Sequence, residues 1–286
     1  MNNLSTPSVI APGAALEKLS GEFSFTEGPA ADSKGNVYFT DQPNDRIMLW
    51  SIEGKLSTFM QPCGRSNGMF FDKEGFLWSC ADEHNQLWKI GMDKKVTVVV
   101  KADADGKLLN GPNDVWVHPK KGMGYYFTDP LYVRPYWKRD PARQPAGEYV
   151  YFVSADFKTV RPVITDFVKP NGIVGTNDGK TLYVADIGGN KTYRYKIEKD
   201  GSLTDKKLHY ALGSDGMTLD SEENLYITGK GVTVVDKNGQ LIENIAVPEG
   251  WTANVCFGGR DRKTLFITAS KGLYSIKTRT KGVDNQ

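Results

Sequence analysis

The fold of this chain is decided by a repeated stretch, of which one copy reads GMFFDKEGFLWSCAD at residues 68–82. The copy contains a glycine after a polar residue, a short apolar strand, an Asp-x-x-Gly turn and a second strand rich in aromatic residues. Related stretches read GPAADSKGNVYFTD at 28–41, NDVWVHPKKGMGYYFTD at 113–129, GIVGTNDGKTLYVAD at 172–186, GMTLDSEENLYIT at 216–228 and ANVCFGGRDRKTLFIT at 253–268. The chain therefore carries six copies of one structural unit.

The spacing of the copies indicates how the units assemble. They recur at roughly 40 to 60 residues, the range in which internal similarity marks the blades of a propeller. One small antiparallel sheet cannot bury both of its faces, whereas sheets stacked around an axis bury one another and leave only short edges. We therefore predict an all-β fold, a six-bladed β-propeller, that forms a single domain over residues 1–286.

Four segments lie outside the repeat. Residues 1–14 are expected to form an N-terminal extension, and residues 15–25 to supply the strand that closes the ring against the last blade. Residues 278–286 are polar and are expected to form a frayed tail. The insertion 130–148 is rich in proline, arginine and aromatic residues, which predicts a lid over one channel mouth, with a dimer contact as the alternative.

Charge and composition exclude several classes of protein. The net charge is +2, and basic residues alternate with acidic ones rather than forming the stripe of a nucleic-acid binder. No apolar run is long enough to cross a membrane. The N-terminus lacks the features of a secretory signal, which predicts a cytoplasmic protein, or a periplasmic or secreted one if a signal has been removed. Three cysteines, Cys63, Cys80 and Cys256, form no disulfide framework, although one pair is compatible with the sequence.

Polar residues stand where the innermost strand of each predicted blade begins. Because the blades surround one axis, equivalent positions of different blades converge at the channel. The residues at these positions are Glu27, Asn67, Asn113 with Asp114, Asn171, Asp215 and Asn254. Carboxylate and amide oxygens are the ligands that Ca²⁺ prefers, and the set lacks the histidine and cysteine typical of zinc or copper sites. The alternative for each Asx-Gly pair is a tight turn, but turn formation does not require a glutamate before Gly-Pro.

The sequence also resembles a known family. Matching blocks are FTEGPA at 25–30, KPNGI at 169–173, DGKTLYVAD at 178–186, SDGMTLD at 214–220 and NVCFGGRDRKTLFIT at 254–268. In order and spacing these blocks resemble the gluconolactonase, senescence-marker and luciferin-regenerating enzyme family, closest to its bacterial gluconolactonase-like branch. The resemblance implies a six-bladed propeller that hydrolyses lactones of sugar acids with one divalent cation in its channel, usually Ca²⁺.

The resemblance assigns roles to particular residues. The metal ligands of the family fall on Glu27, Asn171 and Asp215, and an asparagine that contacts substrate or a metal-bound water falls on Asn113. We expect the cation to polarise the lactone carbonyl and to activate water. Asp215 is the candidate general base, and Asn113 the residue that orients the substrate. Zn²⁺, Mn²⁺ and Mg²⁺ remain alternatives to Ca²⁺.

Two departures from the family pattern concern substrate binding. Animal members carry an arginine two residues before the blade-three asparagine, where this chain has Gly111, and the family's substrate-binding glutamate is replaced near Tyr132. Further candidates for substrate contact, taken from the sequence around the strand ends, are Arg65, His84, Tyr132, Trp137 and Trp251. Asp186 is a candidate for the outer shell of the metal, but Asp41 and Asp129 at equivalent positions favour a structural role in turns.

Two functions are compatible with these observations. The first is a metal-dependent lactonase with a small-molecule lactone as its partner. The second is a non-catalytic propeller that serves as an interaction platform, with a structural cation in the channel, because propellers host both kinds of function. The polar ring that includes Glu27, Asn171 and Asp215 favours the enzyme. A monomer and a homodimer are equally compatible with the sequence.

Overall fold

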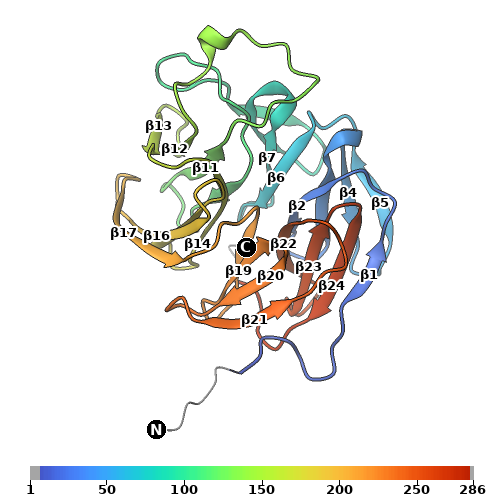
Figure 1. Cartoon of the computed structure of the whole chain (residues 1–286). Coiled ribbons are helices and arrows are strands. Elements are labelled where there is room, and N and C mark those ends of the chain that lie inside the picture. Colours follow the sequence, from blue (N-terminus) through green and yellow to red (C-terminus); the bar gives the residue numbers. More distant parts are fainter. Residues whose placement is uncertain (1–6, 284–286) are drawn as a thin grey trace.

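The computed structural model describes residues 7–283, which form a six-bladed β-propeller. Figure 1 shows six small sheets arranged in a ring around a central axis. Each sheet has four antiparallel strands, and in the described part of the chain the helical structure is limited to single 3₁₀ turns, including η1 (Gln42–Asn44), η2 (Asp82–His84) and η3 (Pro141–Arg143). The predicted fold class is confirmed.

The strands follow the chain around the ring. Blades one and two comprise β2 (Thr26–Ala31), β3 (Val37–Asp41), β4 (Arg46–Trp50), β5 (Leu56–Met60), β6 (Ser66–Phe71), β7 (Leu77–Ala81), β8 (Gln86–Ile90) and β9 (Val96–Val100). Blades three and four comprise β10 (Val115–Val117), β11 (Tyr125–Asp129), β12 (Tyr149–Val153), β13 (Val160–Ile164), β14 (Pro170–Gly175), β15 (Thr181–Asp186), β16 (Lys191–Ile197) and β17 (Leu203–Tyr210). Blades five and six comprise β18 (Met217–Leu219), β19 (Leu225–Gly229), β20 (Gly231–Val235), β21 (Leu241–Ile245), β22 (Thr252–Gly258), β23 (Thr264–Ala269), β24 (Gly272–Lys277) and β1 (Glu17–Ser20).

The two ends of the chain close the ring together. Strand β1 pairs with β24 as the outermost strand of blade six, as predicted for the segment 15–25. Because this sheet contains strands from both ends of the chain, a ladder of backbone hydrogen bonds joins the N-terminal strand to the last blade and closes the ring. Ile10 forms a further bridge with Thr278.

The segment expected to be a frayed tail is held in place over its described part, residues 278–283. Thr278 and Thr280 are buried, and Thr280 Oγ1 donates a hydrogen bond of 2.7 Å to Asp220 Oδ2. Gly282 forms an isolated bridge with Asp220. Polarity suggested solvent exposure, but the Thr280 hydroxyl binds a buried carboxylate of blade five, and the Thr278 hydroxyl donates to the carbonyls of Lys263 and Thr280. The rest of the expected tail, 284–286, and the first six residues of the expected extension 1–14 lie outside the described residues.

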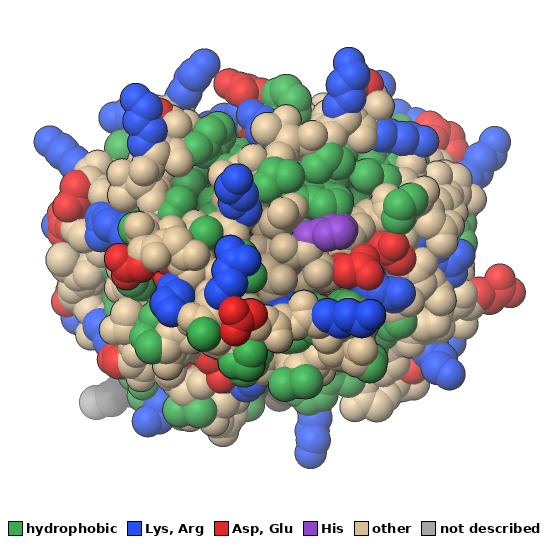
Figure 2. All heavy atoms as spheres, turned by 90° about the horizontal axis from the view of Figure 1, so that it is seen from above, with side chains coloured by type: hydrophobic (Ala, Val, Ile, Leu, Met, Phe, Trp, Pro, Cys, Tyr) green, Lys and Arg blue, Asp and Glu red, His purple; other side chains and the backbone are tan. Residues whose placement is uncertain are grey.

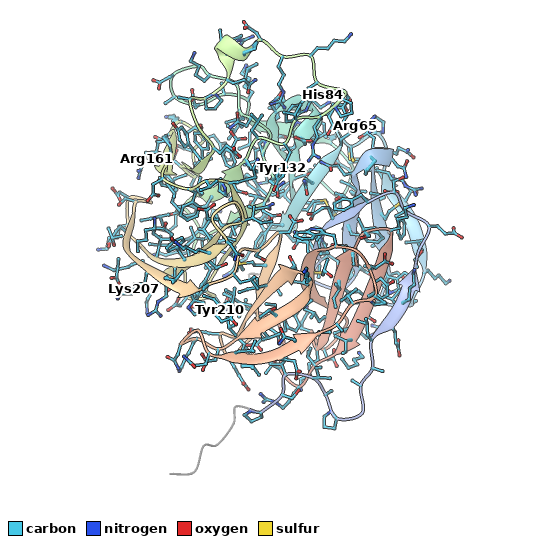
Figure 3. All side chains as sticks on the ribbon, in the orientation of Figure 1. Arg65, His84, Tyr132, Arg161, Lys207 and Tyr210 are labelled. Carbon is cyan, nitrogen blue, oxygen red and sulfur yellow. The ribbon has the colours of Figure 1, made fainter. Side chains whose placement is uncertain are left out.

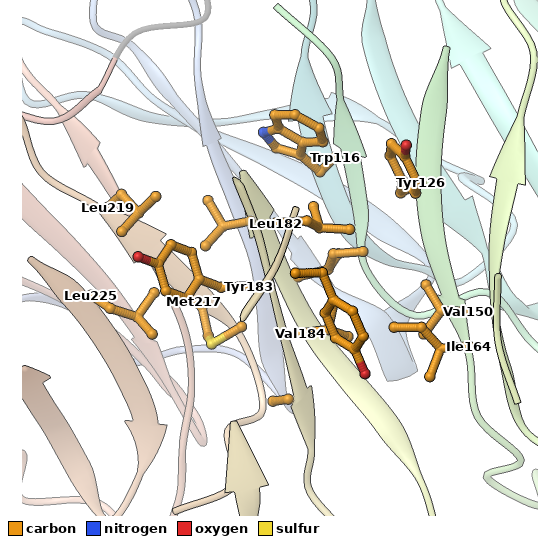
Figure 4. Packing of buried hydrophobic residues seen from close by; sticks show 14 of the residues in the cluster. Trp116, Tyr126, Val150, Ile164, Leu182, Tyr183, Val184, Met217, Leu219 and Leu225 are labelled. Carbon is orange, nitrogen blue, oxygen red and sulfur yellow. The ribbon is translucent and has the colours of Figure 1, made fainter. Parts of the chain in front are cut away.

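The hydrophobic core lies between neighbouring blades. Figure 4 shows the cluster in which blades three, four and five meet, which includes Trp116, Leu182 and Leu219. All three side chains are fully buried. The repeated apolar strands of the sequence therefore bury their faces against the next blade, which makes the ring a rigid frame for side chains at its axis.

Aspartates at the ends of the second strands hold the loops that lead to the innermost strands. Asp41 Oδ1 accepts hydrogen bonds from the backbone N–H groups of Ser24 and Phe25 at 2.9 and 3.2 Å. Asp129 and Asp186 do the same for the loops of blades three and four. The structural interpretation of these aspartates therefore accounts for Asp186, whose carboxylate accepts three backbone N–H groups.

The insertion 130–148 projects beyond the ring at the top of Figure 1 and packs against η2. Arg134 Nε and the Tyr136 hydroxyl donate hydrogen bonds of 2.9 and 2.6 Å to Asp82 Oδ2, and Trp137 Nε1 donates to the Asp82 carbonyl at 3.2 Å. Its aromatic residues thus pack onto the blade-two turn. Whether the insertion acts as a lid stays a prediction.

The surface and the cysteines match the composition. Viewed from the side on which the insertion projects, Figure 2 shows Lys and Arg side chains scattered among Asp and Glu rather than gathered in a stripe. Cys63, Cys80 and Cys256 are buried free thiols. Within residues 7–283, the search for an apolar helix of membrane-spanning length finds none.

Candidate functional site

A cavity of about 540 Å³ lies where the innermost strands of the blades begin. Its walls contain most of the polar residues that the repeat places at those positions, together with residues of the insertion. The lining residues are Phe25, Glu27, Gln42, Pro43, Asn67, Asn113, Tyr132, Arg134, Asn171, Ile187, Asp215 and Trp251. The convergence predicted from the blade repeat is therefore present in one cavity.

Two buried carboxyl groups, those of Glu27 and Asp215, interact electrostatically in this cavity. Glu27 lies in β2, where its Oε2 accepts a hydrogen bond of 2.6 Å from the N–H of Gly28. Asp215 precedes β18, and its Oδ2 accepts a hydrogen bond of 2.7 Å from Trp251 Nε1. Burial raises the pKa of Asp215 to about 6, and burial together with Asp215 and Asp114 raises the pKa of Glu27 well above its usual range. The cavity therefore favours an added positive charge.

Three asparagine oxygens in the same lining have no hydrogen-bond donor. The Oδ1 atoms of Asn67, Asn113 and Asn171 are buried and make no hydrogen bond within residues 7–283, although the great majority of buried polar atoms in proteins are paired. The amide of Asn171 is oriented because its Nδ2 donates a hydrogen bond of 3.0 Å to the Tyr132 hydroxyl. Its Oδ1 is therefore left as an unsatisfied acceptor.

Asn254 connects the cavity to a further buried carboxylate along the axis. Its Nδ2 donates to Glu27 Oε2 at 3.1 Å and to Asp114 Oδ1 at 3.2 Å. A Cβ on Gly216 would overlap this amide, and one on Gly68 would overlap the Asp114 carboxylate. Both glycines are thus required for the close approach of side chains from neighbouring blades.

The donor set fits a hard divalent cation. Carboxylate oxygens of Glu27 and Asp215 and amide oxygens of asparagines such as Asn171 are ligands typical of Ca²⁺, which accepts six to eight oxygens in a flexible geometry. Within residues 7–283, no three His, Cys, Asp or Glu side chains are grouped so as to hold a metal ion. A cation here would therefore depend on amide oxygens as well as on the two carboxylates.

Comparison with known proteins assigns the family. A family model described as "SMP-30/Gluconolactonase/LRE-like region" matches residues 25–271. The chain belongs to this family. The match spans every blade of the ring, so membership concerns the whole propeller and agrees with the resemblance seen in the sequence.

Individual gluconolactonase-like relatives cover most of the chain. A gluconolactonase of Zymomonas mobilis is 25% identical over 93% of this chain and 82% of its own. A lactonase named drp35 from Staphylococcus haemolyticus is 37% identical over 81% of this chain and 72% of its own. The solved structure of a gluconolactonase from Xanthomonas campestris superposes with a TM-score of 0.83 at 26% identity, covering 94% of this chain and 91% of that one.

The ligand positions implied by the gluconolactonase-like family lie together. Glu27, Asn113, Asn171 and Asp215 all line the cavity, each on or just before an innermost strand. Tyr132 and Trp251, candidates for substrate contact, line it too. Their hydrogen bonds to Asn171 and Asp215 make them neighbours of the ligand positions and not only wall residues.

Three other candidates for substrate contact lie outside the lining. Arg65 donates to the Pro43 carbonyl and forms an ion pair with Glu83 at 3.5 Å. His84 is exposed and stacks on Trp88, and Figure 3 shows it farther from the middle of the ring than Tyr132. Trp137 packs on η2 through its hydrogen bond to the Asp82 carbonyl. The contacts of these side chains are thus made with blade two and the turns beside it.

Two polar residues of the lining were not singled out from the sequence. Arg134 comes from the insertion, and Gln42 begins η1 at the end of β3. The insertion has no counterpart in other blades, so the repeat gives no position for Arg134 relative to the axis. The only signal was its place among the aromatic residues of the insertion.

Proposed function

We propose that this protein is a metal-dependent lactonase that hydrolyses a sugar lactone such as gluconolactone to the aldonic acid. The observation that carries the proposal is the set of buried oxygen acceptors in one cavity, including Glu27, Asp215 and the unpaired Oδ1 of Asn171. Family membership and the names of the relatives, gluconolactonase and lactonase, support the choice of reaction.

The proposed cofactor is one divalent cation, Ca²⁺ in preference to Zn²⁺, Mn²⁺ or Mg²⁺. Glu27, Asn171 and Asp215 would hold it, with Asn113 and Asn67 as further oxygen donors in the same lining. When bound, such a cation supplies Lewis acidity toward the lactone carbonyl and lowers the pKa of water. A ligand set made only of carboxylate and amide oxygens disfavours Zn²⁺, and Ca²⁺ is preferred to Mg²⁺ because it accepts more protein oxygens in a flexible geometry.

The protein's own groups would handle the proton and the substrate. Asp215 is the proposed proton acceptor, because its carboxylate is buried in the cavity and held in one orientation by Trp251 Nε1. The hydrogen bond from Trp251 lowers the pKa of Asp215, while burial raises it, and the result is about 6. The carboxylate is therefore ionised near neutral pH, where it can accept a proton. Asn113 is proposed to orient the substrate.

The insertion 130–148 is proposed to act as a lid over the cavity. Tyr132 reaches the ligand position Asn171, and the segment that follows is anchored on Asp82. A cover that excludes bulk water strengthens electrostatic interactions in the site. A cavity of about 540 Å³ lies within the range typical of small-molecule sites.

The proposal is tested by the initial rate of glucono-δ-lactone hydrolysis, followed with a pH indicator and corrected for spontaneous hydrolysis. Chelator-treated protein is measured without and with added Ca²⁺, beside Asp215→Asn and the exposed-surface control Asp166→Asn. We expect Ca²⁺ to restore hydrolysis in the parent and in the control but not in Asp215→Asn. An interaction platform with a structural cation predicts Ca²⁺-dependent thermal stability with no hydrolysis by any variant.

A further inference from the structure

Arg134 is the cationic side chain that the insertion contributes to the cavity lining. Its Nε donates a hydrogen bond of 2.9 Å to Asp82 Oδ2, and the Arg134 side chain is 24% exposed whereas that of Asp82 is 4% exposed. The Asp82 carboxylate is therefore less accessible to solvent than the Arg134 guanidinium. Among the described residues, no hydrogen bond is formed by the two terminal nitrogens of Arg134. These nitrogens are available to a molecule in the cavity.

The orientation of Arg134 is set by the groups that hold its partner. Asp82 Oδ2 also accepts hydrogen bonds from the Tyr136 hydroxyl at 2.6 Å and from Gln42 Nε2 at 3.3 Å. Arg134 also lies over the Tyr132 ring, with Cζ 5.5 Å from the ring centroid. A guanidinium held through one nitrogen keeps a planar pair of donors suited to a carboxylate or phosphate. Arg134 is thus a preorganised anion-binding group.

The same structure explains why position 111 carries no large side chain. A Cβ on Gly111 would overlap Asp82 Oδ1 and would lie 3.0 Å from the Trp137 ring. The space that a side chain at position 111 would enter is therefore filled by the residues that anchor the insertion. An arginine reaching the cavity must come from another segment, and Arg134 is that residue.

We propose that Arg134 selects lactones that carry an anionic substituent, a carboxylate or a phosphate, remote from the lactone carbonyl. The inference rests on the proposed lactonase function and names its substrate class. The lining contains the acceptor oxygens of Glu27 and Asp215 and also the guanidinium of Arg134. A neutral sugar lactone has no anionic group for the guanidinium, whereas an aldaric acid lactone or a phosphorylated aldonolactone has one.

The test compares kcat/KM for neutral glucono-δ-lactone, glucaro-1,4-lactone and 6-phosphoglucono-δ-lactone in Ca²⁺-loaded protein. Variants are Arg134→Gln, Arg134→Lys, Asp82→Asn and the control Arg143→Gln, an exposed arginine of the same insertion. We expect Arg134→Gln to lower kcat/KM for one or both anionic lactones by about tenfold to a hundredfold, and to affect the neutral lactone much less. Arg134→Lys should keep part of the preference, and Arg143→Gln all of it.

A binding measurement checks the same contact without turnover. Calorimetry compares glucarate, which has a second carboxylate, with gluconate for the parent and for Arg134→Gln. We expect the parent to bind glucarate more tightly, and Arg134→Gln to bind the two acids equally. In the kinetic test, the anionic lactone whose kcat/KM falls more in Arg134→Gln shows whether Arg134 prefers a carboxylate or a phosphate.

Three results would overturn the inference. The first is that the parent protein has equal kcat/KM values for neutral and anionic lactones. The second is that Arg134→Gln lowers kcat/KM by the same factor for all three lactones. If Asp82→Asn also shows this second result, Arg134 only anchors the insertion, and the proposed lactonase function is unaffected. The third is an absence of hydrolysis for every lactone, which would contradict both the proposed function and the inference.

Discussion

The hydroxyl of Tyr132 lies 3.0 Å from Nδ2 of Asn171 and accepts its hydrogen bond. One residue belongs to the insertion 130–148 and the other to the innermost strand β14. The contact fixes which end of the amide is a donor to the protein, and it leaves Asn171 Oδ1 as a buried acceptor. The insertion thus takes part in presenting an oxygen that the proposed cation would use.

Tyr132→Phe removes the acceptor for Asn171 Nδ2, so the amide loses its fixed orientation. We expect Ca²⁺ affinity to fall roughly fivefold, which corresponds to a net hydrogen bond of about 1 kcal/mol. Calorimetric titration with Ca²⁺ measures this change. Tyr136→Phe is the matched control, because its hydroxyl binds Asp82 and not a ligand position. Equal losses in both variants would show that the insertion as a whole, and not this hydrogen bond, supports the site.

Cation affinity is expected to depend on pH through Asp215. Its pKa is raised to about 6 in the cation-free protein, so protons compete with the cation below that pH. We predict that Ca²⁺ affinity is nearly constant above pH 7 and falls steadily below pH 6. Titrations at several pH values test this, with Asp215→Asn expected to bind weakly and with less pH dependence. A parent affinity that stays unchanged from pH 8 to pH 5 would argue against Asp215 as a ligand.

The same raised pKa predicts how stability changes with pH in cation-free protein. A carboxyl whose pKa is higher in the folded than in the unfolded state binds more protons when folded, so the free energy of unfolding decreases as pH rises. For Asp215 this decrease falls between about pH 4 and pH 6. Asp215→Asn should have a shallower decrease in thermal denaturation experiments, and saturating Ca²⁺ should abolish most of it. A cation-free parent with the same pH dependence as the variant would contradict this assignment.

Trp251→Phe removes the N–H that donates to Asp215 Oδ2 at 2.7 Å. Because this hydrogen bond favours the ionised carboxyl, its loss raises the pKa of Asp215 further. We expect Ca²⁺ affinity to fall roughly fivefold to tenfold near pH 6 and less at pH 8. Trp137→Phe, which alters a tryptophan outside the cavity lining, is the control. A loss in Trp251→Phe that is equal at both pH values would mean that the indole contributes packing alone.

Gly216→Ala tests the close packing around Asn254. A Cβ at this position would overlap the amide that binds Glu27 and Asp114, so either the amide or the strand must move. We expect a loss of about 2–3 kcal/mol in the free energy of unfolding, together with weaker Ca²⁺ binding. Gly250→Ala is the control, since apart from its chain neighbours no atom of the described residues lies within 4 Å of the added Cβ. Normal stability and Ca²⁺ binding in Gly216→Ala would show that the axis tolerates displacement of Asn254.

The propeller architecture could be predicted from the sequence because the sequence pattern of a blade repeats. A polar residue before the first strand, a polar turn and a second strand rich in aromatic residues recur in the blades, so the innermost strand starts could be located from the sequence. Convergence of Glu27, Asn171 and Asp215 in one cavity follows from symmetry, because equivalent positions of different blades meet at the axis. Closure of the ring by the segment 15–25 was predictable for the same reason.

Features that occur once were not predictable in this way. The insertion has no repeat to set its direction, so the contact of Tyr132 with Asn171 and the position of Arg134 depend on tertiary packing. His84 and Arg65 stand near strand ends in the sequence, but turn geometry directs His84 onto Trp88 and Arg65 toward Pro43. The tail was misjudged because a buried carboxylate, Asp220, supplied a partner for Thr280.

The central claim is that hydrolysis and cation binding occur at the same cavity oxygens. The measurement that tests it most directly is a Ca²⁺ titration of chelator-treated protein, recording bound Ca²⁺ and the initial rate of glucono-δ-lactone hydrolysis in the same samples, with Asn171→Ala and Asp215→Asn beside the parent. We predict that rate and occupancy rise together with one midpoint in the parent, that the midpoint moves to higher Ca²⁺ in Asn171→Ala, and that Asp215→Asn stays inactive. Full hydrolysis without bound cation, or unchanged midpoints in both variants, would contradict the account.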